Sequence, residues 1–293
     1  KLSASSSLSM SSYGFCYNLE QDMYSMVLKT GIQTTRLRHD YLLIQDAGNL
    51  RLGIDCQLHT YTPSIIDARV KDYSIDLGQS SRLSAVENAL YAEYPVQLGS
   101  HISLTTGLRL SQFAHLGPFT HYGEGLVQKD STVFKRGQVV KNFFYPEPRI
   151  TASYRTSEHS SVKASATFNT QFSHIVPIIS SALPAEMWLP STTDLVPQKV
   201  LQASCGYFVG LWGHEFGIDL YGKVLKDLWE PRGNMMNFYD RGNIKELLAR
   251  GEGRAFGCEL SIDKRSGKLS YSLAYTYSRS LRLFADINGG RVY

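Results

Sequence analysis

Hydrophobic and polar positions alternate along most of this chain with a period of two. The pattern is plainest near the C-terminal end, where one parity is apolar or aromatic and the other is small and mostly polar. The first set is Leu269, Tyr271, Leu273, Tyr275 and Tyr277, and the second is Ser270, Ser272, Ala274, Thr276 and Ser278. This period predicts a β-strand with two unlike faces. Such a strand fits either a soluble β-sandwich, with its apolar face inward, or a membrane barrel, with its apolar face toward lipid.

The same alternation predicts about eleven strands. Their expected ranges are 2–15, 23–38, 49–61, 83–96, 101–113, 145–154, 161–175, 200–210, 214–227, 254–263 and 268–283. In several of them the second parity is charged: Arg51 and Asp55 oppose Leu52 and Ile54. Charges on the second face are too polar for a protein core, but they suit a water-filled lumen.

The connections between these strands also favour a membrane barrel. After a polar connection over residues 63–81, turns of about three to five residues alternate with long loops over 115–143, 176–198 and 228–252. Soluble sandwiches have mostly short connections, whereas outer-membrane barrels have short turns on one side and long loops on the other. An open sheet has unpaired edges that lipid does not tolerate. We therefore expect the chain to be an internal piece, about half, of a larger barrel.

Composition agrees with this fold and excludes other classes. Hydrophobic residues make up 43% and charged residues 19%, with 18 tyrosines, and no apolar run is long enough for a transmembrane helix. The net charge of +4 is spread along the chain without a basic block, so nucleic acid is not an expected partner. The four cysteines lack close spacing and predict free thiols, buried or facing lipid, and no metal site.

Five strings resemble TonB-dependent outer-membrane receptors. They are ENALYAEYPVQLGSHISLTTGLRLSQF (87–113), YPEPRITASY (145–154), VKASATFNTQFSHIV (162–176), MWLPSTTDLVPQKVLQASCGYF (187–208) and the segment from GEGRAFG to the end (251–293). The details are closest to Bacteroidetes-type receptors with a carboxypeptidase-regulatory-like N-terminal domain. The resemblance implies that residues 1–293 are part of a single barrel domain of about 22 strands. The plug domain and the closing C-terminal strands would lie outside this chain.

The resemblance also implies a location and partners. The protein would lie in the outer membrane of a Gram-negative bacterium, surrounded by lipid. The TonB–ExbB–ExbD system would act through the missing plug and TonB box. A surface lipoprotein partner and a small-molecule or oligomeric nutrient ligand would complete the assembly.

Two groups of residues are candidates for ligand contact. His121, Tyr122, Trp188 and Tyr239 lie in the three long loops, where exposed aromatic side chains suit ligand capture by stacking. The alternatives for these residues are loop-to-loop packing or an interfacial aromatic girdle, and the girdle is the expected place of Trp229.

The second group is expected to line the lumen: Arg109, Glu215, Asp219 and Glu259. Arg109 and Arg149 would contact plug or substrate, or form salt bridges between neighbouring strands. The three acidic residues and Asp263 lie on adjacent hairpins, but an ion site would need them to converge.

No catalytic motif accompanies these residues. The chain has no GxSxG, no HExxH and no phosphate-binding loop before a helix. We expect no enzyme activity and no cofactor. The leading hypothesis is a receptor barrel that imports a bulky nutrient, such as a metal chelate, an oligosaccharide or a peptide. The alternatives are a soluble β-sandwich or lectin-like binding module, and an outer-membrane barrel with a structural role and no transport.

Overall fold

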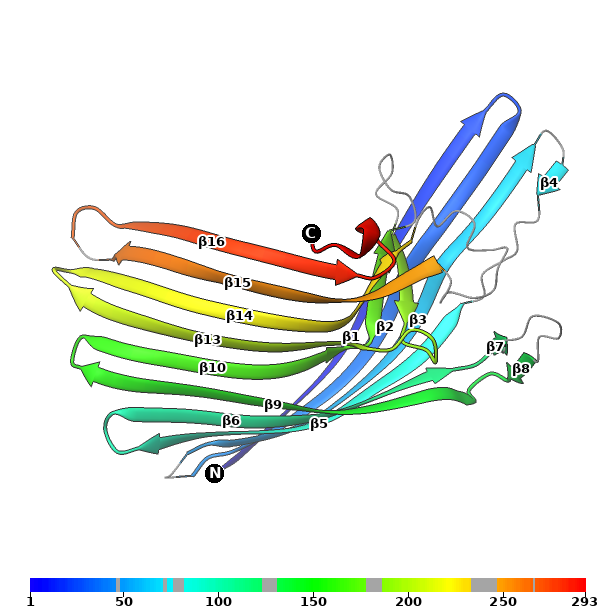
Figure 1. Ribbon diagram of the computed structural model, residues 1–293. Helices are drawn as coiled ribbons and strands as arrows, with labels where there is room; N and C mark the ends of the chain where they lie inside the picture. The colour runs from blue at the N-terminus through cyan, green and yellow to red at the C-terminus, as the bar shows by residue number, and fades with distance from the viewer. Residues whose placement is uncertain are drawn as a thin grey trace.

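The fold is a single large antiparallel sheet with two small accessory hairpins (Figure 1). A computed structural model describes residues 1–45, 48–70, 73–75, 82–122, 131–177, 186–232, 247–265 and 267–293. No helix in these ranges is long and apolar enough to cross a membrane. The strands are β1 (Leu2–Gln21), β2 (Tyr24–Leu43), β3 (Leu50–Val70), β4 (Tyr73–Ile75), β5 (Leu83–Leu98), β6 (Ile102–Leu116), β7 (Phe119–Tyr122), β8 (Ser131–Phe134), β9 (Val139–Ser157), β10 (Ser160–Gln171), β11 (Ser173–Pro177), β12 (Glu186–Pro190), β13 (Gln198–Leu211), β14 (His214–Pro231), β15 (Leu248–Lys264) and β16 (Tyr271–Phe284).

The main sheet runs in chain order. Its path is β1-β2-β3-β5-β6-β9-β10-β13-β14-β15-β16, with β4 paired to the end of β3. Eleven strands therefore form the wall, and β1 and β16 are its two edges within the described residues. The prediction of an antiparallel barrel wall of about eleven strands is confirmed.

Residues of one parity form continuous apolar rows across the outer face. One row crosses seven strands through Leu104, Ala152, Ala164, Cys205, Leu220, Cys258 and Tyr277. Leu220 is 53% exposed and Tyr277 56% exposed. A strand's side-chain period of two keeps such a row on one face. The outer face is therefore apolar and uncovered, as a wall toward lipid requires.

From β5 onward, short and long connections lie at opposite ends of the strands (Figure 1). Trp212 and Gly213 make the β13–β14 turn with φ of 53° and 74°, which is the two-residue turn that matches strand twist. The connections at the other end are long and contain β7, β8, β11 and β12. The β1–β2 connection is an exception, because a turn at Asp22 and Met23 closes it at that same end. The predicted alternation of turns and loops is confirmed.

The expected polar connection over residues 63–81 is wrong in its first part, because β3 continues to Val70. β2 supplies a partner strand over this length, with Tyr24 opposite Val70. The register shifts between Lys29 and Gly31, where Thr62 and Ile65 are the flanking partners. Pro63, which has no N–H to donate, therefore lies in a bulge rather than in the ladder.

β10 separates from β9 and leads the chain inward. The two strands pair only up to Thr167 opposite Arg149. Beyond that point β9 carries Pro146 and Pro148, and its ladder with β6 runs through both without a shift. A proline can stand in an unbroken ladder only where its nitrogen faces away from the partner. The nitrogens must then face the β10 side, so β9 lacks two donors that β10 would need.

The segment after β10 forms a hairpin, β11–β12, on the inner face of the wall (Figure 1). We call residues 172–177 and 186–198 the inner hairpin. Phe172 stacks on Phe113 of β6, with ring centroids 5.0 Å apart and planes 4° apart. On the other side Thr30 Oγ1 donates to the Glu186 carbonyl at 2.5 Å. The hairpin therefore spans the wall from β6 to β2.

Two small hydrophobic cores hold the inner hairpin in place. One contains Leu28, Val176, Met187, Leu189, Leu195 and Leu248, and the other contains Tyr61, Ala85, Phe113, Phe143 and Phe172. Two buried hydrogen bonds also hold the inner hairpin together. His174 Nε2 lies 2.9 Å from Ser191 Oγ, and this hydroxyl donates to the Phe172 carbonyl at 2.9 Å. The sequence predicted a long outward loop over residues 176–198, but residues 176–177 and 186–198 form a packed inner layer, and the rest of that loop lies outside the described residues.

Candidate functional site on the inner wall

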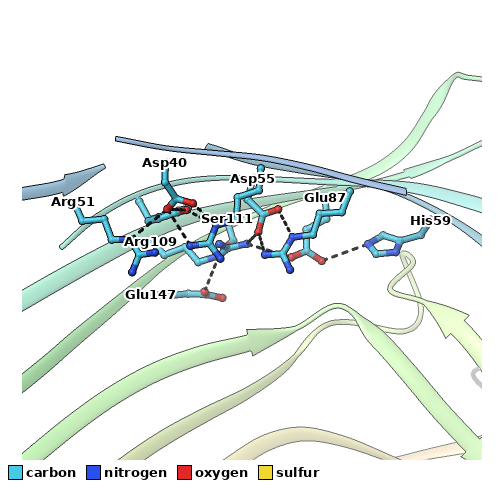
Figure 2. Close-up of polar contacts among 11 residues, drawn as sticks. Asp40, Arg51, Asp55, His59, Glu87, Arg109, Ser111 and Glu147 are labelled. Atoms are coloured by element: carbon cyan, nitrogen blue, oxygen red, sulfur yellow. Dashed lines mark hydrogen bonds and ion pairs between the residues drawn. The ribbon is translucent and has the colours of Figure 1, made fainter. Parts of the chain in front are cut away.

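The inner face of β2, β3, β5, β6 and β9 carries a network of charged side chains (Figure 2). One part of this network is centred on Asp55, which is 1% exposed. Arg36 holds this carboxylate in a two-pronged ion pair, Nε to Oδ1 at 2.8 Å and Nη2 to Oδ2 at 2.6 Å. Arg109 adds a third donor, Nη2 to Oδ2 at 3.2 Å. Such charge-assisted, bidentate pairs fix geometry as well as charge.

Arg109 connects Asp55 to two further carboxylates. Its Nη2 lies 3.7 Å from Glu87 and its Nε lies 3.8 Å from Glu147. Nε also donates to Ser111 Oγ at 3.2 Å. Glu147 in turn accepts a hydrogen bond from the Thr170 N–H at 3.0 Å, so it bridges the place where β10 leaves β9. This part of the network ties the wall to the start of the inner hairpin.

The other part of the network is centred on Asp40. Arg38 pairs with it through Nε at 2.8 Å and Nη2 at 3.0 Å. Arg51 approaches it at 3.3 Å, and the Tyr91 hydroxyl donates to it at 2.6 Å. The guanidinium carbons of Arg38 and Arg109 lie 5.4 Å and 5.8 Å from the centre of the Tyr91 ring. Tyr91 therefore joins the two parts, by its hydroxyl and by its ring.

The four residues predicted to line the lumen fall in two places. Arg109 lies in the network just described. Asp219 is opposite Glu259 in the β14–β15 register, and Glu215 is opposite Asp263. Glu215, Asp263 and Lys163 line a hollow of 580 Å³ near the short turns. The acidic pairs are thus brought together, at a distance from Arg109 along the sheet.

The four residues predicted to contact ligand have different outcomes. Trp188 lies on β12 and its ring packs 5.8 Å from that of Tyr13, so its expected place in an exposed loop is wrong. His121 and Tyr122 end β7, opposite Thr132 and Ser131 of β8. Tyr239 lies outside the described residues. Ligand contact by these residues remains a prediction.

The expected place of Trp229 in an outer girdle is also wrong. Its Nε1 donates to the Val196 carbonyl at 2.9 Å, and its ring packs on the first core of the inner hairpin. The physical reason is that the inner hairpin lies against this end of β14 and offers an apolar core to the ring and a backbone acceptor to its N–H.

Sequence reasoning missed most members of the network. Arg36, Glu87 and Glu147 were not singled out, although each lies on the polar parity of its strand. The signal was the repetition of one to three charged residues on that parity in five strands. The pairing of those strands, which sequence periodicity leaves open, places the charges side by side.

Solved structures with a similar fold exist, although no family model and no curated protein sequence matches the chain. The ferric yersiniabactin uptake receptor FyuA from Yersinia pestis aligns with a TM-score of 0.62 and 13% identity, over 98% of this chain and 41% of that one. The FrpB iron transporter from Neisseria meningitidis (F3-3 variant) aligns with a TM-score of 0.56 and 12% identity, over 95% of this chain and 44% of that one. The copper transporter OprC aligns with a TM-score of 0.59 and 13% identity, over 92% of this chain and 40% of that one.

These likenesses define the class of fold. The three proteins are TonB-dependent receptors of the outer membrane, and this chain has the fold of a part of their barrel. It spans less than half of their length. The apolar outer face and the charged inner face described above agree with such a barrel.

Proposed function

We propose that this chain is the barrel segment of a TonB-dependent outer-membrane receptor that takes up a bulky nutrient. Residues 1–293 would be part of a single barrel domain, closed by further strands and filled by a plug. Uptake would be driven by the TonB–ExbB–ExbD system through that plug. The ligand would be a metal chelate, an oligosaccharide or a peptide, and a surface lipoprotein would assist its capture.

The observation that carries the proposal is the inverted polarity of the sheet. Apolar rows such as Leu220–Cys258–Tyr277 lie on the uncovered outer face, whereas Asp55 and its partners lie on the inner face. A soluble sandwich would bury the apolar rows against a second sheet. The structure has no such second sheet among its described residues. The polarity therefore favours lipid outside and water inside.

The network on the inner wall suits the passage of a solute better than catalysis. The network pairs four arginines, Arg36, Arg38, Arg51 and Arg109, with four carboxylates, Asp40, Asp55, Glu87 and Glu147, so their charges balance. Among the described residues no group of His, Cys, Asp and Glu is placed to hold a metal ion. A polar wall with balanced charge keeps a lumen wet and offers weak contacts to a passing solute.

Two experiments test the proposal in the organism that carries the gene. First, the complete gene product should fractionate with the outer membrane and need detergent for extraction; a soluble monomer would contradict the membrane assignment. Second, growth on candidate nutrients, including ferric chelates and oligosaccharides as sole sources, should require this gene and tonB alike. A gene product that stays in the outer membrane but is dispensable for growth on every nutrient would favour the structural barrel instead.

A further inference from the structure

A hollow lined by arginines lies directly beside the network, toward the short turns, and is separate from the hollow at Glu215. Its volume is 160 Å³, and four guanidinium groups contribute to its lining: Arg38, Arg51, Arg109 and Arg149. They come from four strands, β2, β3, β6 and β9, and share the inner parity. Tyr91 lies among them, between Arg38 and Arg109.

The charges around this hollow leave a positive excess. Arg109 is already engaged by Asp55, Glu87 and Glu147. Arg38 and Arg51 share Asp40. Arg149 is exposed and has no hydrogen bond or ion pair with the described part of the chain. Glu93 adds a carboxylate to the lining. The count therefore sets three positive charges, on Arg38, Arg51 and Arg149, against two negative charges, on Asp40 and Glu93. One positive charge is left over.

Gly107 leaves space for the side chain of Arg149. Gly107 is opposite Arg149 in the β6–β9 register, and the arginine stem lies across it. A Cβ at residue 107 would be 2.8 Å from Arg149 Cγ and 3.1 Å from its Cδ. The absence of a side chain on β6 therefore lets the Arg149 stem lie along the wall beside the other arginines.

We propose that this hollow is an anion-binding subsite, in which Arg149 and Arg51 hold a carboxylate or phosphate group of a passing nutrient. Guanidinium forks match the two oxygens of such groups, and several of them in a hollow concentrate the field on an anion. Placing the subsite inside a lumen rests on the proposed function, while the binding of an anion by the hollow does not. The proposal narrows the nutrient to one that carries at least one oxyanion group.

The test uses the complete gene product, purified in detergent, and calorimetric titration with citrate and, separately, inorganic phosphate. Arg149→Gln should weaken the binding of the preferred anion at least tenfold, because it removes the unpaired cation. Gly107→Ala keeps every charge but displaces the Arg149 stem, and it should weaken binding as well. Arg149→Lys keeps the charge without the fork and should fall between Arg149→Gln and the parent protein.

The matched control is Arg265→Gln. Arg265 lies in the other hollow, 3.5 Å from Glu215, so its loss changes the net charge equally and should leave anion binding unchanged. The inference is overturned if the parent protein binds neither anion, if Arg149→Gln binds as well as the parent, or if Arg265→Gln loses as much. If Arg149→Gln fails to fold, Gly107→Ala provides the test instead, and anion binding as strong as in the parent protein would then overturn the inference. Nutrient uptake is scored separately: uptake without anion binding refutes only the subsite, and binding without uptake refutes only the proposed function.

Discussion

Two regions of the wall share an outer face and differ on the inner one. In β2–β6, the covered half, the inner hairpin packs on the inner face, and the carboxylate of Asp55 at the centre of the network is buried and paired. In the short-turn ends of β13–β16, the uncovered half, the inner side chains are half-buried or exposed, and the ion pair of Arg265 with Glu215 is open to solvent. One strand pattern thus gives two environments, because a second layer covers only one of the two regions. The position of a residue in the strand alternation decides which face it occupies. The packing over that face decides how much a charged side chain there contributes to the free energy of unfolding.

The largest expected difference between the halves concerns single aspartates. Asp55→Ala should lower the free energy of unfolding by about 3–5 kcal/mol, because Arg36 and Arg109 lose a buried partner. Asp219→Ala, on the uncovered half, should cost under about 1 kcal/mol. Urea unfolding of the complete gene product in lipid bilayers, followed by tryptophan fluorescence, measures both. Equal losses would mean that the inner hairpin does not change the environment of the wall.

The second difference concerns the contact that anchors the cover. Phe172→Ala should cost about 3 kcal/mol, since this ring is 3% exposed and stacks on Phe113. Amide hydrogen exchange should then speed up over residues 173–177 and stay unchanged in the short-turn ends of β13–β16, which the described part of the hairpin does not contact. Phe208→Ala removes a half-buried ring from the uncovered half and is the matched control. Undisturbed exchange in β11 after Phe172→Ala would contradict the packing described for the hairpin.

A third prediction tests what the halves have in common. Ile54→Arg and Leu220→Arg place a charge on the outer face of the covered and the uncovered half, where the parent side chains are 46% and 53% exposed. Each should cost about 2 kcal/mol or more in a bilayer and little in a detergent micelle, where water reaches the guanidinium. A cost in only one half would show that the other half does not face lipid.

The smallest expected effect separates two tryptophans. Trp229→Phe removes the hydrogen bond from Nε1 to the Val196 carbonyl and should cost about 1 kcal/mol. Trp212→Phe changes a turn residue that is 87% exposed and should be neutral within about 0.5 kcal/mol. The same urea titration compares them. A neutral Trp229→Phe would place this side chain outside the hairpin core.

Most of the wall could be predicted from the sequence, and part of the site could not. The alternation over 254–263 and 268–283 fixes which residues of β15 and β16 face outward, because a side-chain period of two admits only one division of faces. Arg109 and Arg149 were found on the inner parity by the same rule. The contacts of Arg109 with Asp55 and Glu147 were not predicted, since these residues lie 54 and 38 residues from Arg109 in the sequence, and only strand pairing brings them near.

The sequence by itself determined the strands, their two faces and the rhythm of short and long connections, all of which follow from local periodicity and turn chemistry. Only the tertiary structure decided that residues 172–177 and 186–198 turn inward. That choice rests on contacts such as Tyr61 with Ser173, 2.7 Å apart and 112 residues distant, and Thr30 with Glu186, 156 residues distant. A loop of mixed composition has no period that reports such partners. Its place is set by the apolar surface it buries against the wall, and that surface exists only once the strands have paired.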